Sequence, residues 1–340
     1  MTPEPHTLGS PNVVFLIGAP RSGTTWLQSL LGSNPAVVTP QETDLFSTFI
    51  APLQTWWDDQ LARTSSEHVA RRTKGLPAVL DDAQFTELLA TLVSRVLKAI
   101  QELDPSASVI VEKSPSHSNH VELIRKYLPD ATFLHLVRDG RDVVASLQSA
   151  SRGWGSYWAP GSLKRAGLMW KTNVLAARAA GGTPGYVEVR YEALRAGDPE
   201  PLRRAFASCG IEITLDECNR LLEEFSLERM TKGDVASPIA VGGDLSSVGA
   251  RREPEGFYGM GAVGGWAASW SVKDRLFFDA VAGDLLIDLG YEPDHGWAGS
   301  PVRRGWYSRQ SAVRRCVAKA GRHMGNRLVR RSARALSRVA

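Results

Sequence analysis

The stretch of the chain that most constrains its fold is residues 13–27, VVFLIGAPRSGTTWL. A continuous apolar and largely β-branched run stops at Gly18, a loop of Gly, Pro and Ser follows, and a helical pattern starts near Thr24. A strand, a glycine loop and a helix in this order build a cradle, because loop N–H groups and the positive helix N-terminus converge on one anion. We therefore predict a phosphate-binding loop near the start of an α/β domain.

This loop departs from the nucleotide-binding P-loop at one position. Gly18 and Gly23 have the P-loop spacing, but Thr24 follows where a P-loop has Lys. The fixed positive charge is instead Arg21, inside the loop. Such a loop suits one phosphate that carries one transferable group better than a triphosphate with its metal. An ordinary strand-to-helix turn is the alternative.

Composition limits the class of protein. With 340 residues, 43% of them apolar, the chain can form one large domain or two small ones. Its three cysteines, at 209, 218 and 316, lack metal-ligand spacing, so we expect reduced thiols in a reducing compartment. No apolar run reaches about eighteen residues, and the first residues lack the basic and apolar regions of a secretory signal. We expect a cytoplasmic protein without a membrane span.

Charge is concentrated at the C-terminus. Residues 298–340 carry eleven Arg, one Lys and no acidic residue, which is a net charge of about +12. Because the whole chain has a net charge of +4, residues 1–297 carry about −8. On a helix, Val313, Val317 and Met324 fall on one apolar stripe. This tail either lies on an anionic inner-membrane surface, docks on a partner, or is a solvated basic extension. Nothing in it resembles a nucleic-acid reading module, so we expect no nucleic-acid partner.

Apolar periodicity predicts strands that alternate with helices. The expected strands are 13–17, 36–39, 108–111, 132–137 and 186–191, and the expected helices are 24–31, 81–103, 117–128, 139–150, 163–180, 201–209, 215–225 and 274–289. Alternation implies parallel pairing, so we predict an α/β fold of three layers, a mostly parallel sheet with helices on both faces. Residues 45–80 are expected to form helical pieces and loop. Residues 233–265, with nine glycines, are expected to form a long loop that acts as a lid.

A second strand–helix junction, FLHLVRDGRDVVAS over residues 133–146, carries a candidate phosphate site. Arg138 ends the buried strand, and Ser146 lies eight residues later, about two helical turns on. An Arg at the carboxyl edge of a strand is well placed to bind a phosphate through two parallel N–H groups of its guanidinium. A salt bridge from Arg138 to Asp139 or Asp142 is the alternative, and the sequence leaves it open.

Together the two motifs resemble those of sulfotransferases that use 3′-phosphoadenosine 5′-phosphosulfate (PAPS). PRSGTTW, residues 20–26, is similar to the 5′-phosphosulfate loop of that family, and the Arg138–Ser146 spacing is similar to its 3′-phosphate site. The similarity spans residues 12–295. It implies a P-loop NTPase-like sulfotransferase fold over 12–297, between a disordered lead-in (1–11) and the basic tail (298–340). The PAPS-binding residues that it implies are Arg21, Ser22, Gly23, Thr24, Thr25, Trp26, Arg138, Ser146 and Tyr191.

The resemblance also implies catalytic residues, with Arg21 among them. Glu42 stands in the context of the catalytic Glu of tyrosylprotein sulfotransferases, so it is the expected general base; a helix acid or cap is the alternative. Lys113, in the EKSP segment 112–115, resembles the family's catalytic Lys. Cytosolic sulfotransferases have a basic His two residues after that Lys. Pro115 stands there, which favours Glu42 and leaves His117 as a fallback base.

The adenine site rests on weaker matches. Trp26 either stacks on adenine, as in relatives, or belongs to the core. Tyr191, in VRYEAL, resembles the Tyr of the family that approaches adenine. In the glycine-rich loop, GGW at 264–266 matches the end of a family pattern, but GMG at 259–261 stands where an Arg-Lys-Gly run closes over the 3′-phosphate. Arg residues at 251–252 are a candidate substitute.

The predicted activity is transfer of a sulfuryl group from PAPS to a hydroxyl of a small-molecule, glycan or lipid-linked acceptor, with no metal, giving a sulfate ester and 3′-phosphoadenosine 5′-phosphate (PAP). Two alternatives remain. One is a nucleotide kinase or NTPase, but the absence of the P-loop Lys is evidence against it. The other is a non-catalytic nucleotide-binding adaptor recruited to membranes through its tail. The sequence identifies neither the acceptor nor the oligomeric state.

Overall fold

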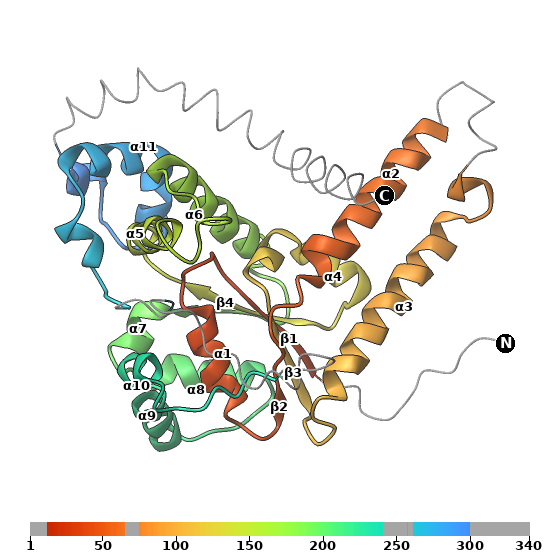
Figure 1. Ribbon diagram of the computed structural model, residues 1–340, viewed down its shortest axis with the longest axis horizontal. Coiled ribbons are helices and arrows are strands. Elements are labelled where there is room, and N and C mark those ends of the chain that lie inside the picture. Colours follow the sequence, from red (N-terminus) through yellow and green to blue (C-terminus); the bar gives the residue numbers. More distant parts are fainter. Residues whose placement is uncertain (1–11, 65–74, 241–256, 258–260, 300–340) are drawn as a thin grey trace. The chain divides into compact units, whose positions relative to one another are not determined.

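The computed structural model describes residues 12–64, 75–240, 257 and 261–299 (Figure 1). Contacts divide the chain into a first unit, Met1–Ser47 with Thr86–Trp266, and a second unit, Thr48–Phe85 with Ala267–Ala340. The predicted lead-in, the Arg pair at 251–252 and the tail from residue 300 onward lie outside the described residues. The single domain expected over 12–297 stays a prediction.

A five-stranded parallel sheet forms the centre of the first unit (Figure 1). Its strands, in the order β2-β3-β1-β4-β5, are β1 (Asn12–Ile17), β2 (Val37–Val38), β3 (Val109–Lys113), β4 (Thr132–Val137) and β5 (Tyr186–Arg190). Every pairing is parallel, and Phe15 of β1 lies opposite Glu112 of β3 and Phe133 of β4. The loop after β1, Lys113 and Arg138 therefore share the carboxyl edge of the sheet, where α/β proteins bind ligands. The predicted parallel α/β sheet is confirmed.

Helices connect the strands close to the predicted ranges. They are α1 (Thr24–Gly32), α2 (Ala51–Thr64), α3 (Asp82–Gln101), α4 (Val121–Tyr127), α5 (Gly140–Ser151), α6 (Leu163–Arg178), α7 (Tyr191–Arg195), α8 (Glu200–Ser208), α9 (Leu215–Glu224), α10 (Leu227–Lys232) and α11 (Val272–Asp288). The helix predicted at 117–128 is split, because a 3₁₀ segment, η4 (Pro115–Asn119), precedes α4. α7 and α10 were not predicted, since five or six residues are too short to show a period.

Both faces of the sheet are covered. On one face, Leu16 and Leu134 belong to a buried cluster with side chains of α1, α8, α9 and α10. On the other face, Phe15 packs against the rings of Phe46 and His117 at 5.8 and 5.7 Å between centroids. Burial of this apolar surface supplies the main driving force for folding and fixes the strand ends in place.

Two of the three cysteines are described. Cys209 and Cys218 are buried free thiols, and burial raises the pKa of Cys209 to about 12. Neither is a reactive thiolate, since only the deprotonated form is a good nucleophile. Cys316 lies outside the described residues.

In the second unit, the segment expected to hold helical pieces contains α2 and a 3₁₀ turn, η3 (Leu76–Ala78). Trp57 is fully buried there, stacks on Phe85 at 4.2 Å, and donates from its indole N–H to Asp82 at 2.8 Å. It is therefore a core residue. Among the described helices, none combines the length and apolar character needed to cross a bilayer.

Candidate active site

The loop between β1 and α1 presents polar groups at the N-terminus of a helix. Gly23, with φ 95°, caps α1, and Arg21 also has a positive φ of 74°. The Ser22 hydroxyl is buried and has no hydrogen-bond partner among the described residues. The first turn of α1 contains no acidic side chain. A buried hydroxyl and a free helix N-terminus at one point favour an anion such as a phosphate.

Tyr191 explains why residue 23 is glycine. A Cβ added to Gly23 would lie 2.6 Å from the Tyr191 ring, and the positive φ would strain any L side chain. The Tyr191 hydroxyl donates to the carbonyl of Gly261 at 3.0 Å, and its ring meets Trp26 edge-on at 5.7 Å. The residue predicted near the adenine thus packs directly on the phosphate-binding loop.

Arg138 points into the same place from the end of β4. Its guanidinium donates to the carbonyls of Arg21 and Ala262, at 3.0 Å each, and lies 4.3 Å over the Tyr191 ring. Its Nε is buried and has no partner in the described part of the chain. A buried guanidinium held by main-chain carbonyls and an aromatic face keeps its charge available for an anion.

The neighbouring aspartates have other partners. Asp139 pairs with Arg141 at 2.6 Å, and Asp142 accepts from the N–H groups of Gly264 and Trp266 at 2.8 and 3.0 Å. Burial raises the pKa of Asp142 despite these two bonds. The salt bridge that the sequence left open for Arg138 is therefore not formed with either carboxylate. Asp142 instead anchors the Gly264–Trp266 segment to the start of α5.

The side chain of Arg21 contacts the second predicted phosphate site. Its Nε donates to the Ser146 hydroxyl of α5 at 3.0 Å, and its NH2 group bonds to the carbonyl of Phe257. The rings of Trp154 and Phe257 lie 5.2 and 5.0 Å from the guanidinium carbon. Arg21, Arg138 and Ser146 thus form one cluster, although the sequence assigned Arg21 to the first site.

A pocket opens beside this cluster, and the residues that line it are Arg21, Gly23, Thr24, Thr25, Trp26, Arg138, Tyr191, Leu227 and Phe257. None of these is acidic, and two of them are arginines, which suits an anionic ligand. Trp26 is only 3% exposed and donates from its indole N–H to the Phe225 carbonyl at 2.7 Å. It is thus a core residue that also lines the pocket.

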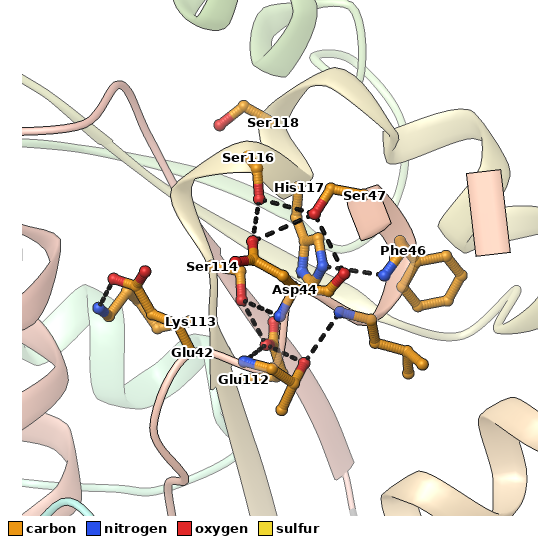
Figure 2. Close-up of polar contacts among 12 residues, drawn as sticks. Glu42, Asp44, Phe46, Ser47, Glu112, Lys113, Ser114, Ser116, His117 and Ser118 are labelled. Atoms are coloured by element: carbon orange, nitrogen blue, oxygen red, sulfur yellow. Dashed lines mark hydrogen bonds and ion pairs between the residues drawn. The ribbon is translucent and has the colours of Figure 1, made fainter. Parts of the chain in front are cut away.

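Glu42 and Lys113 form an ion pair next to the loop (Figure 2). Lys113 Nζ also donates to the Thr25 hydroxyl at 3.2 Å. The Lys113 side chain is 3% exposed and that of Glu42 is 44% exposed, so the pair has one buried member and one member in contact with solvent. Glu42 lies outside any helix, so the alternative of a helix acid does not apply. Two of the three residues predicted for catalysis, Glu42 and Lys113, are thus in direct contact.

His117 has neither ring nitrogen available. It is fully buried, its Nδ1 lies 2.8 Å from Glu112, and its Nε2 accepts from the Phe46 N–H at 3.1 Å. With both ring nitrogens hydrogen-bonded inside the protein, His117 has no free lone pair for the proton of an acceptor, so the fallback assignment of His117 as a base is wrong. Glu112 was missed as a candidate from the sequence, where its position directly after a predicted buried strand was the available signal.

Comparison with known proteins identifies the family. The family model described as "Sulfotransferase family" matches residues 11–216. The chain belongs to the sulfotransferase family. It is 30% identical over 138 residues to protein-tyrosine sulfotransferase 1 of Mus musculus and of Homo sapiens; the match covers 40% of this chain and 34% of each relative. This sulfotransferase chain therefore spans about a third of the length of these curated relatives.

A solved structure supports the same fold. The crystal structure of mouse sulfotransferase SULT7A1 complexed with PAP resembles this chain with a TM-score of 0.53 at 16% identity, covering 82% of this chain and 87% of that one. The parallel sheet with helices on both faces is thus the sulfotransferase fold that the two sequence motifs predicted.

Proposed function

We propose that this sulfotransferase-family chain transfers a sulfuryl group from PAPS to a hydroxyl group of an acceptor. The observation that carries the proposal is the Glu42–Lys113 pair, whose ammonium group also contacts Thr25 in the phosphate-binding loop. A proton acceptor and a cation thus stand beside the place where a 5′-phosphosulfate would bind. General base and electrostatic stabilisation are the two things that this transfer requires.

The described residues fit a ligand with two anionic ends. In this proposal the buried Ser22 hydroxyl and the N-terminus of α1 would hold one anionic end, and Arg138, whose Nε has no partner among the described residues, would hold the other. Among the described residues that line the pocket, none is a carboxylate that would repel phosphates. Ser22, Gly23, Thr24 and Thr25 would hold the 5′-phosphosulfate. Arg138 and Ser146 would hold the 3′-phosphate, and Trp26 and Tyr191 border the space for the adenine.

In the proposed reaction, Glu42 takes the proton of the acceptor hydroxyl as the acceptor oxygen bonds to sulfur. The bond between sulfur and the 5′-phosphate oxygen breaks, and PAP leaves with that oxygen. Lys113 and the Thr25 hydroxyl stabilise the negative charge that develops on the phosphate and the sulfuryl oxygens. The half-exposed Glu42 must exchange its bond to Lys113 for one to the acceptor, and its exposure makes this exchange feasible. Arg and Lys supply the positive charge, so the proposal needs no metal.

The acceptor class is a hydroxyl compound: a small molecule, a glycan, a lipid-linked alcohol or the phenol of tyrosine. Because relatives are named protein-tyrosine sulfotransferase, tyrosine peptides are included in the panel of acceptors to be tested. Five of the ten tryptophans, at 56, 57, 154, 158 and 170, are candidates from the sequence to line an acceptor cleft, but two of them, Trp57 and Trp170, are fully buried core residues. Trp154 packs on Arg21, so aromatic side chains border this part of the site.

Thermal unfolding with two nucleotides tests the donor. PAP at saturating concentration should raise the midpoint of unfolding of the full chain, because a ligand that binds only the folded state stabilises it. Mg·ATP at the same concentration should raise it far less. A larger increase with Mg·ATP than with PAP would support the kinase or NTPase hypothesis and refute the proposed use of PAPS as donor.

Transfer of label from [³⁵S]PAPS across the acceptor panel tests the chemistry. Labelled sulfate esters should form with at least one acceptor class. Binding of PAP without transfer to any acceptor would favour the non-catalytic adaptor instead.

A further inference from the structure

The segment that follows Glu42 is held by side chains. Residues 42–44 belong to no helix or strand. The main-chain N–H groups of the four residues after Glu42, residues 43–46, nevertheless all have hydrogen-bond acceptors (Figure 2). These acceptors are Glu112 Oε1 for Thr43 at 3.4 Å, the Ser114 hydroxyl for Asp44 at 3.0 Å, the Thr43 hydroxyl for Leu45 at 3.2 Å and His117 Nε2 for Phe46 at 3.1 Å. Three of the four therefore come from residues 112–117, at the end of β3.

Glu112 also accepts a hydrogen bond from each of the other three acceptors, which are the hydroxyls of Thr43 and Ser114 and the ring of His117. The hydroxyls of Thr43 and Ser114 donate to Oε1 at 2.7 and 2.8 Å, and His117 Nδ1 donates to Oε2 at 2.8 Å. Each of these groups gives its hydrogen to Glu112 and turns its lone pair to a main-chain N–H. Figure 2 shows the carboxylate of Glu112 at the centre of this arrangement.

An ionised carboxylate suits this position because it only accepts hydrogen bonds. It therefore fixes the direction of both hydroxyls and the tautomer of His117 at the same time. Glu112 is buried, and burial alone would raise its pKa, but the bonds from His117, Thr43 and Ser114 outweigh burial and hold the pKa below its usual value. The group stays an acceptor at neutral pH.

We propose that Glu112 is a positioning residue that fixes Glu42 against Lys113. One buried carboxylate orients the groups that hold residues 43–46, and it is itself the residue before Lys113 in β3. The two members of the ion pair are thus aligned through one buried group that is not among the described residues of the pocket lining. The catalytic consequence rests on the proposed function; the structural part does not.

The closing experiment uses Glu112→Gln in the full chain and two measurements. Gln has the same shape, but its amide NH₂ is a donor, so it must face a group that already donates and reverse one of the bonds. Amide hydrogen exchange of residues 43–46 should accelerate roughly 10- to 100-fold, as expected for loss of bonds to a buried charge. Exchange in β1 and β4 should stay unchanged, and so should the Kd for PAP. With the best acceptor of the panel, kcat should fall by about tenfold or more while KM for PAPS stays constant.

A matched pair of variants guards against a folding defect at Glu112. Thr43→Val removes the hydroxyl at nearly constant volume, so it should accelerate exchange at Leu45 and lower kcat. Thr43→Ser keeps the hydroxyl and should restore both values to near those of the original chain. A purely packing role of Thr43 would give Val the better activity, because Val keeps both branches.

The outcomes separate this proposal from the proposed function. Unchanged exchange at residues 43–46 in both Glu112→Gln and Thr43→Val would overturn the positioning role, whatever the activity. Faster exchange with an unaltered kcat would overturn its catalytic importance. If the original chain transfers no sulfate to any acceptor, the proposed function fails, while the exchange data still decide whether Glu112 fixes the segment.

Discussion

Arg21 Nε donates to the hydroxyl of Ser146 at 3.0 Å across 125 residues of sequence. Arg138 donates to the main-chain carbonyl of Arg21, so two guanidinium groups and one hydroxyl belong to a single cluster. A phosphate with two negative charges is well matched to two guanidinium groups. Within the proposed function, Arg21 is therefore placed to bind the 3′-phosphate.

Arg21→Met tests this placement, because Met keeps much of the length and removes the charge. The affinity for PAP should fall by roughly 10- to 100-fold, the range for a hydrogen bond to a charged group. The affinity for adenosine 5′-phosphate, which lacks the 3′-phosphate, should change little. Titration calorimetry with both nucleotides measures the two values. Equal losses for both would instead place Arg21 at the 5′-phosphosulfate, as the sequence analysis expected.

Glu42→Gln tests the general base. The amide can still accept a hydrogen bond from Lys113 but cannot take a proton at neutral pH, so kcat should fall by about 10²- to 10⁴-fold. The affinity for PAP should be retained, since Glu42 lies outside the pocket lining. Steady-state transfer from [³⁵S]PAPS and PAP calorimetry give the two values. Near-full turnover with intact PAP binding would refute the assignment.

Much of this arrangement could be predicted from sequence because it is local. The apolar run before Gly18 and the helix pattern after Thr24 fix a strand–loop–helix, and the strands that end near Lys113 and Arg138 follow the same rule. Parallel pairing then brings all three strand ends to one edge. Glu42 follows β2, and the parallel pairing of β2 with β3 brings it to Lys113 at the end of β3.

The parts that sequence could not give depend on side-chain direction. A positive φ at Arg21 and the contact with Ser146 decide where that guanidinium lies, and neither leaves a pattern in the sequence. The tautomer of His117 is set by Glu112 and the Phe46 N–H, so a residue that looked like a spare base is structural. Asp142 binds main-chain N–H groups more than a hundred residues away, which no local rule predicts.

Gly23→Ala should disable the phosphate-binding loop. Its Cβ would lie 2.6 Å from the Tyr191 ring at φ 95°, so either the ring or the loop must move. Gly233 is a matched control: it has φ 76°, and a Cβ there meets nothing within 4 Å. Gly233→Ala should cost about 1 kcal/mol of unfolding free energy from the backbone alone. Urea unfolding should show a larger loss for Gly23→Ala, with PAP binding abolished; equal losses would contradict the steric explanation.

The basic tail predicts salt-sensitive binding to anionic membranes. Residues 298–340 carry about twelve positive charges and no acidic residue, and each basic residue near an anionic surface adds about 1 kcal/mol. The full chain should co-sediment with vesicles of phosphatidylserine and phosphatidylcholine at low salt and be released at about 0.5 M salt. A chain ending at Gly299 should stay in the supernatant. Equal sedimentation of both chains would exclude the tail as the membrane contact.

Glu188 of β5 supplies a stability contribution that should vanish in acid. Arg178 binds both of its oxygens, at 2.7 and 2.9 Å, and the Tyr186 hydroxyl donates to it at 3.1 Å. Burial alone would raise its pKa, but the hydrogen bonds from His135 and Arg178 and the charge of Arg178 hold the pKa well below its usual value. A carboxyl whose folded pKa is depressed stabilises the fold above its unfolded pKa, near 4.3, and loses this contribution as pH falls below it.

Glu188→Gln should therefore lower the unfolding free energy by about 1–3 kcal/mol at pH 7. The difference in unfolding free energy from the original chain should stay constant down to about pH 5 and shrink progressively below about pH 4.3. In that range Glu188 binds a proton in the unfolded chain but stays ionised in the folded chain. Urea unfolding across this range measures it. Glu228→Gln is the control, since that carboxylate is exposed and pairs only with Lys232 on the surface of α10, so its effect should be small at every pH. A Glu188→Gln difference that persists unchanged in acid would mean that packing, and not the charge of Glu188, carries the stability.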